Sequence, residues 1–261
     1  MSAAIEQQLP GQLPEGMDAS LLGGLQPMLK NMGGTMFGLQ LGGAVGALGK
    51  EVLSGTDIGL PVAGHRLALV PVNIEEFGDG LSVPDDQIRI YLALREAARM
   101  RLFLHSPWLE RDLYAAVEQY AAGIRLDTEG IERAAQSVDP MDPGSLQAVF
   151  DGASFIAAPD ATQQAALDQL ELLVALVEGW VDVVVAEAAR PLESAAALRE
   201  TMNRRRASGG PAEQAFAALV GLELRPRRLR EAAAFWEHVT AEQGGVHALG
   251  EPVSYTHLTL P

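Results

Sequence analysis

The chain has 261 residues, a 48% share of hydrophobic residues and a formal net charge of -15. That length suffices for one large domain or two small ones, and the composition is typical of a folded protein rather than a disordered one. The acidic balance argues against general nucleic-acid binding, and the lack of cysteine excludes disulfides, thiolate nucleophiles and cysteine-type zinc sites.

The two ends of the sequence differ from the part between them. Residues 1–17 are rich in Pro, Gly and Gln, so we expect a flexible N-terminal segment. No secretory signal is evident in it, which makes the cytoplasm the expected location. Residues 253–261, "VSYTHLTLP", are similar to the translation of a sequencing-library transposon end. We therefore expect a non-native tail there and a single domain over residues 18–252.

The first internal segment, Asn31 to Gly49, carries no charge, and three of its glycines (38, 42 and 46) are four residues apart. Small residues at this spacing occur on helix-packing faces, so a membrane span is one interpretation. The other is a helix that packs closely in a soluble core. We favour the second, because a span needs roughly 20 strongly apolar residues and this segment is only weakly apolar.

Turns and one extended segment precede the helical part of the chain. Residues 55–61, "GTDIGLP", form a turn-rich link, and residues 65–74, "HRLALVPVNI", have the β-branched content of one short strand. Apolar residues then recur at three- and four-residue steps, which predicts helices. In chain order these span about residues 82–105, 108–124, 159–191, 192–210, 211–223 and 225–245.

Two side chains at the end of the first long helix have both structural and functional interpretations. His105 is a candidate metal ligand or general base, but a histidine there more often interacts with the C-terminal end of the helix dipole. Trp108 follows a proline, and we expect it to be a core anchor. The arginine runs "NRRRAS" and "RPRRLR" are the only basic patches. They could bind a phosphate, a nucleic acid or an acidic partner, or be solvated helix ends that pair with nearby acids.

The sequence "REAAR" places Arg95, Glu96 and Arg99 together on one helix, since residues four apart share a helix face. This is the spacing of His-Glu-x-x-His, in which two imidazoles hold zinc and the glutamate activates a metal-bound water. A simpler alternative is a solvated surface pair between Glu96 and Arg99, which would contribute roughly 0.2–0.5 kcal/mol.

Three blocks of the sequence give a resemblance to a known family. Phe103 and the Pro-Trp-Leu corner follow "REAAR", "VEGWVD" spans residues 177–182, and "GLELRPRRLREAAAFWEHV" spans residues 221–239. In this order they resemble predominantly actinobacterial zincin-like proteins, described as hydrolases or zinc-dependent metalloproteases, with one branch linked to deazaflavin-cofactor biosynthesis. The resemblance covers about residues 20–245 and implies a zincin-like helical fold.

The resemblance also implies a degenerate metal motif in this chain. Arg95 and Arg99 stand where the family has its histidines, and Trp180 stands where it has another. Arginine has no acceptor lone pair and cannot ligate zinc, so we expect no cofactor here, although the family uses zinc. Glu96 keeps the position of the catalytic glutamate but has no metal-bound water to activate.

The remaining acids suggest a replacement for the metal. Glu178 and Asp182 match the family block, and with Glu96 they could form salt bridges to Arg95 and Arg99 in the inherited cleft. Buried pairs of this kind add little net stability, because desolvation offsets the attraction. Such a cluster would therefore fix the register of the helices more than it stabilises them. The alternative to a place in the cleft is that Glu178 lies at the edge of the apolar stripe of its helix.

These observations predict a mainly α, zincin-like multi-helix domain with at most one or two short strands. The first functional hypothesis is a hydrolase of the metalloprotease family that has lost most or all activity. The second is a non-catalytic binding or scaffolding protein whose cleft holds a peptide or a small anionic ligand. The third is a metal-free hydrolase with Glu96, Glu178 and Asp182 as acid and base.

Overall fold

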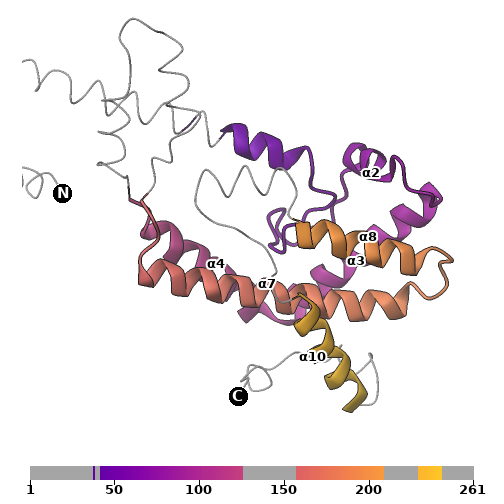
Figure 1. Ribbon diagram of the computed structural model, residues 1–261. Helices are drawn as coiled ribbons and strands as arrows, with labels where there is room; N and C mark the ends of the chain where they lie inside the picture. Colours follow the sequence, from indigo (N-terminus) through magenta and orange to yellow (C-terminus); the bar gives the residue numbers. More distant parts are fainter. Residues whose placement is uncertain (1–37, 39–41, 126–156, 209–228, 243–261) are drawn as a thin grey trace, which may run out of the picture. The chain divides into compact units, whose positions relative to one another are not determined.

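The computed structural model describes residues 38, 42–125, 157–208 and 229–242 (Figure 1). The chain divides into two units, residues 1–43 and 44–261, and the description below concerns the second. The expected N-terminal segment and the expected tail lie outside the described residues, and so does the helix expected over residues 211–223.

The described residues are mainly helical, which confirms the predicted fold class. Their only β-type pairing is an isolated antiparallel bridge between Ser54 and Leu69. The named helices are α2 (Pro71–Gly78), α3 (Asp85–His105), α4 (Pro107–Ala122), α7 (Ala161–Ala188), α8 (Ala195–Ser208) and α10 (Leu229–Glu242).

Helix α7 is the centre of the core, and α3, α4, α8 and α10 all contact it. It begins with a capping box: the side chain of Asp160 accepts hydrogen bonds from Thr162 N–H and Gln163 N–H, and the Gln163 side chain accepts one from Asp160 N–H. Most of the second half of the helix is buried on all sides, as its run of Val, Leu and Ala requires.

Ser106 lies between α3 and α4, and a proline begins α4. Helix α3 starts with Asp85 and Asp86 in its first turn, where acids suit the helix dipole, and it ends at His105. Pro107 is the first residue of α4, a position where the missing N–H costs nothing. The corner lets both helices pack against α7. Trp108 is partly buried and packs against the core at this corner.

The expected strand over residues 65–74 is wrong in its second half. Pro71 is the first residue of α2, since its fixed φ suits the start of a helix. The remaining part is extended only as far as Val70, whose N–H donates to the Leu53 carbonyl at 3.0 Å. Gly55 N–H donates to the Ala68 carbonyl, also at 3.0 Å. Residues 53–55 and 68–70 therefore form a short two-stranded contact near α3.

The described end of the uncharged N-terminal segment, residues 42–49, is helical; the rest of that segment, apart from residue 38, lies outside the described residues. Across the described ranges, no helix combines the length and the apolar character needed to cross a membrane.

Candidate functional site

Three charged side chains of α3 are buried, although such residues normally lie at the surface. Arg95, Glu96 and Arg99 expose 2%, 2% and 1% of their surface. Arg95 and Arg99 lie one turn apart on the same face of α3. Because all three residues are inside the protein, a solvated surface pair does not describe them.

Glu178 of α7 is the carboxylate that both arginines contact, and it is fully buried. Arg95 Nη2 donates to Glu178 Oε2 at 2.7 Å. Arg99 donates twice, from Nε to Oε1 at 2.8 Å and from Nη2 to Oε2 at 3.0 Å. In this double contact, one guanidinium group donates two hydrogen bonds to the two oxygens of one carboxylate, which is a particularly strong arrangement. Two side chains of α3 therefore converge on one carboxylate of α7.

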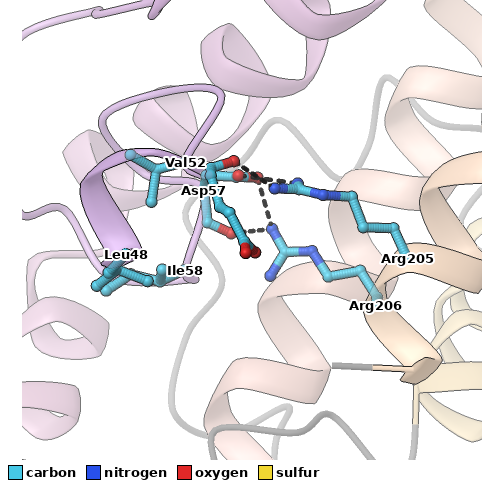
Figure 2. A pocket seen from close by; sticks show the side chains of 7 residues that line it. Leu48, Val52, Asp57, Ile58, Arg205 and Arg206 are labelled. Atoms are coloured by element: carbon cyan, nitrogen blue, oxygen red, sulfur yellow. Dashed lines mark hydrogen bonds and ion pairs between the residues drawn. The ribbon is translucent and has the colours of Figure 1, made fainter. Parts of the chain in front are cut away.

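A third buried guanidinium reaches this carboxylate from α8. Arg206 Nη2 lies 3.5 Å from Glu178 Oε1 and also donates to the backbone carbonyl of Asp57 and, at 3.1 Å, to its Oδ1. Arg205 Nη1 donates to the other oxygen of the Asp57 carboxylate at 3.0 Å (Figure 2). Asp57 thus connects the two α8 arginines to the loop before α2. We call Arg95, Arg99, Arg206, Glu178 and Asp57 the ion-pair cluster.

The hollow in Figure 2 lies beside the two α8 arginines. It measures about 20 Å³, which is room for one water molecule. Its lining combines apolar and charged side chains, from Leu48, Glu51, Val52, Asp57, Ile58, Arg205 and Arg206. A space of this size cannot hold a peptide or a drug-sized ligand.

Glu96 does not join the ion-pair cluster through hydrogen bonds. Its Oε2 accepts from the Thr56 hydroxyl at 2.5 Å and from Thr56 N–H at 3.2 Å, and its Oε1 accepts from Ala68 N–H at 3.3 Å. Ala68 belongs to the contact between residues 53–55 and 68–70, and Thr56 directly follows its first segment. The carboxylate of Glu96 therefore connects these two loop segments and anchors them to α3.

Asp182 pairs with an arginine of α8 and not with Arg95 or Arg99. Its Oδ2 accepts from Arg199 of α8, at 2.9 Å from Nε and 2.6 Å from Nη2. Arg199 Nη2 also lies 3.4 Å from Glu237 Oε1 of α10. Of the residues predicted for the site, the structure brings Arg95, Arg99 and Glu178 together, while Glu96 and Asp182 each bind other partners.

His105 is exposed and its Nδ1 donates to the Arg101 carbonyl at 2.8 Å, which is the helix-end role expected for it. Trp180 is buried, two residues along α7 from Glu178. Successive residues of a helix turn by about 100°, so Trp180 points some 200° away from Glu178. Trp180 therefore lies on another face of α7 than Glu178, the residue that Arg95 and Arg99 contact.

Asp57 and Arg206 were not among the predicted site residues. Asp57 stands in a turn-rich link, where its residue type gives no sign of a distant partner. Arg206 did have a signal in the sequence: it follows Leu198 and Met202 at four-residue steps, and both are 1% exposed. An arginine in phase with an apolar stripe indicates a buried charge.

The ion-pair cluster contains three guanidinium groups and two carboxylates, and all five side chains are buried. Burial opposes ionisation of Glu178, but the guanidinium groups of Arg206, Arg99 and Arg95 outweigh it and lower its pKa to about 2. Burial likewise opposes ionisation of Asp57, and Arg206, Arg205 and Arg99 hold its pKa well below the usual range. Both carboxylates are therefore ionised at neutral pH, as their buried partners require.

This pKa shift predicts an acid dependence of stability. The pKa of Glu178 is about 2 in the folded protein, against 4.5 for a free glutamate, so the unfolded chain takes up the proton first as pH falls. The stabilisation is complete above about pH 4.5 and is lost between there and about pH 2. Urea unfolding at several pH values should therefore show the free-energy gap between wild type and Glu178→Gln shrinking across this range. A gap that is constant from pH 6 to pH 2.5 would contradict the assignment.

Removing one hydroxyl tests the anchoring role of Glu96. Thr56→Val keeps the shape of the side chain but removes the short contact with the Glu96 carboxylate. We expect a loss of roughly 1.5–3 kcal/mol in the free energy of unfolding, since the bond is to a buried charged group. Thr201→Val is the control, because its hydroxyl only donates to the Ala197 carbonyl one turn away on an exposed face. Equal losses in the two variants would contradict the anchoring role.

The donor atoms around Glu178 do not suit a zinc ion. Among the described residues, no three His, Cys, Asp or Glu side chains are grouped so that they could hold a metal ion. The nitrogens of Arg95 and Arg99 are hydrogen-bond donors without a free lone pair. Arg95 Nε and Nη1 are buried without a partner, and they too would repel a cation. The residues present therefore do not fit zinc.

One family model matches most of the chain. Residues 1–248 match the model of the zincin-like metallopeptidase family. The chain therefore belongs to that family. A search of curated proteins found no match, and neither did a search of solved structures.

Proposed function

We propose that this chain is a zincin-like family member without metallopeptidase activity, in which the ion-pair cluster stands at the position of the metal centre. The observation that carries the proposal is the convergence of Arg95 and Arg99 on Glu178 in the buried α3–α7 contact. The two positions that should present imidazole lone pairs present hydrogen-bond donors instead, and the carboxylate facing them is already bound.

The state of Glu96 supports the same conclusion. A general base in this mechanism needs an oxygen that can take a proton from an activated water. Both oxygens of Glu96 accept hydrogen bonds from the loop, from Thr56 and Ala68. A role as a buried anchor accounts for this glutamate without any catalytic step. A metal-free hydrolase that uses Glu96, Glu178 and Asp182 gains no support, because each of the three binds a different partner.

Binding of a small anion on the same arginines finds no support in the geometry. Arg95 and Arg99 expose almost none of their surface, and Glu178 occupies the contact that an anionic ligand would need. The ligand would have to displace a buried, charge-paired carboxylate, which is costly. We therefore assign the ion-pair cluster a structural role and not a ligand-binding one.

Hydrolysis of a fluorogenic peptide library tests the proposal. Wild type, with and without added zinc, and the Glu96→Gln variant should all show the background rate of the buffer. Turnover by the wild type that Glu96→Gln or a chelator abolishes would overturn the proposal.

A further inference from the structure

The segment between Leu60 and α2 covers Glu96 without contributing side chains to the core. Leu60 before it and Ile74 after it are buried, whereas none of residues 62–70 is buried. Burial of apolar side chains is the main force that fixes a segment to a core, so this segment depends on other contacts. We call residues 61–70 the flap.

Two side chains of α4, one turn apart, hold the first half of the flap. Glu110 Oε2 lies 2.8 Å from Nε2 of His65, and the hydroxyl of Tyr114 donates to the Pro61 carbonyl at 3.3 Å. The side chain of His65 is 55% exposed, and Tyr114 is 37% exposed. Water competes for contacts at such positions, so each contributes little by itself. We call these two contacts the α4 contacts.

Three hydrogen bonds of the backbone hold the second half of the flap. Ala68 N–H donates to Glu96 Oε1 at 3.3 Å, and the Ala68 carbonyl accepts from Gly55 N–H at 3.0 Å. Val70 N–H donates to the Leu53 carbonyl at 3.0 Å. Because all three bonds use the backbone of the flap, one displacement of the flap breaks them together.

The contact between the flap and the Glu96 region is close but small. A Cβ added at Gly55 would lie 2.8 Å from the Cβ of Ala63, 3.3 Å from the Cβ of Ala68 and 3.3 Å from Glu96 Oε1. Two methyl groups of the flap therefore lie on the glycine beside the carboxylate. No larger side chain of the flap is buried there, so little apolar contact is lost when the flap moves away.

Two glycines provide pivots for such a movement. Gly59, just before the flap, has a φ of 83°, and Gly64, within it, has a φ of 64°. Both values lie in the left-handed region, which glycine adopts without strain. A Cβ added at Gly64 would have no neighbour within 4 Å, so the turn there has room to rotate. Glycine also has the widest range of other backbone conformations, which suits a hinge.

We propose that the flap is a hinged cover of Glu96, which opens as one unit while the helical core stays folded. Opening breaks the α4 contacts and the three backbone hydrogen bonds. It frees Oε1 of Glu96, whereas Oε2 keeps its bonds to Thr56. The inference is independent of the proposed function, because no residue of the ion-pair cluster takes part in the movement.

Amide hydrogen exchange of the full chain, followed by NMR, tests the inference. The N–H groups of Gly55, Ala68 and Val70 should show protection factors within about threefold of one another, because one opening frees all three. They should exchange roughly a hundredfold faster than the slowest amides of α7. Urea below the unfolding transition should accelerate exchange in α7 but hardly at these three amides, since opening the flap exposes little surface. A response to urea as large as that of α7 would show that the flap opens only with the whole protein, and would overturn the inference.

Thr56 distinguishes opening of the flap from opening of the turn beneath it. Its N–H follows that of Gly55 in the chain, but it donates to Glu96 Oε2 and not to the flap. Thr56 N–H should therefore be protected roughly tenfold more than Gly55 N–H. Equal protection of the two would mean that residues 53–70 open together, which contradicts a flap that moves by itself.

The double variant Glu110→Gln/Tyr114→Phe removes the α4 contacts without changing any residue of the flap. Exchange at the three flap-dependent amides should accelerate by one common factor, roughly threefold or more. Glu118→Gln is the matched control, since Glu118 is exposed on the same helix two turns further along. Its flap should exchange at the wild-type rate. Unchanged exchange in the double variant, or an equal acceleration in the control, would overturn the inference.

Cleavage by trypsin gives a second measurement. The bond after Arg66 lies in the flap, and binding in a protease cleft requires the flap to leave the protein surface. Cleavage there, identified by the masses of the fragments, should accelerate in the double variant by the same factor as amide exchange. Arg89 is exposed but lies within α3, and the bond after it should stay intact over the same time. A rate at Arg66 that is the same in the wild type and the double variant would count against the hinged flap.

Discussion

Glu178→Gln should lower the free energy of unfolding by roughly 3–5 kcal/mol. The substitution keeps the size of the side chain but removes the charge that Arg95, Arg99 and Arg206 share. Breaking a buried pair costs more than the pair contributed, because the partners keep their charge and lose their compensation. Urea unfolding monitored by circular dichroism measures the loss directly.

Glu200→Gln is the matched control for this substitution. Glu200 pairs with Arg204 one turn away on α8, and both side chains are largely exposed. A pair of this kind contributes within about 0.5 kcal/mol, so the control should stay near the wild type. Similar losses in the two variants would show that the effect on the free energy of unfolding does not come from the burial of Glu178.

Gly179→Ala should disrupt the contact between α7 and α10. A Cβ at residue 179 would lie 2.7 Å from the backbone carbon of Ala232 and 2.8 Å from the backbone nitrogen of Ala233. These are backbone atoms, so a side-chain rotation cannot relieve the clash, and α10 would have to shift away. We expect a loss of roughly 1–3 kcal/mol in the free energy of unfolding.

The disturbance should be largest where α10 is fixed to α7. Trp236 Nε1 donates to the Leu176 carbonyl at 2.9 Å, and this bond depends on the close approach at Gly179. The fluorescence of Trp236 should therefore change in Gly179→Ala. Gly46→Ala is the control: Gly46 is helical and exposed, and its added Cβ would have no neighbour within 4 Å. There we expect no loss, and a small gain from helix propensity. Equal loss in both variants would contradict the packing argument.

The sequence predicted the part of the site that depends on helical spacing. Residues four apart share a face, so Arg95 and Arg99 could be placed together from "REAAR" alone. The family block supplied Glu178 as the carboxylate of the facing helix. The helical fold followed from the same periodicity, and the order of the described helices agrees with it.

The rest of the site depends on contacts between segments far apart in the sequence, and helical spacing alone does not specify these contacts. Glu96 was expected to pair with the neighbouring arginines of its own helix, but it binds Thr56 and Ala68, 40 and 28 residues away. Asp182 was grouped with Glu178 because both match one block. It lies one turn further along α7, and that single turn changes its partner to Arg199. Short spacing rules specify a face of a helix but not the segment that packs on it.

The error at Pro71 has a similar origin. Val70, Val72 and Ile74 have strand-like side chains, and the β-branched content predicted an extended segment. Proline at the first position of a helix changes the outcome, because its φ angle already fits the helix and it needs no N–H partner there. The same proline gives α2 its start directly after the loop that Glu96 anchors.

Zinc content of the purified wild type, measured by mass spectrometry after dialysis against a weak chelator, tests the central claim most directly. With guanidiniums bound to Glu178, the zinc content should fall far below one ion per chain. Saturation with zinc before dialysis should leave that result unchanged. One zinc retained per chain, and lost in Glu178→Gln, would contradict the account.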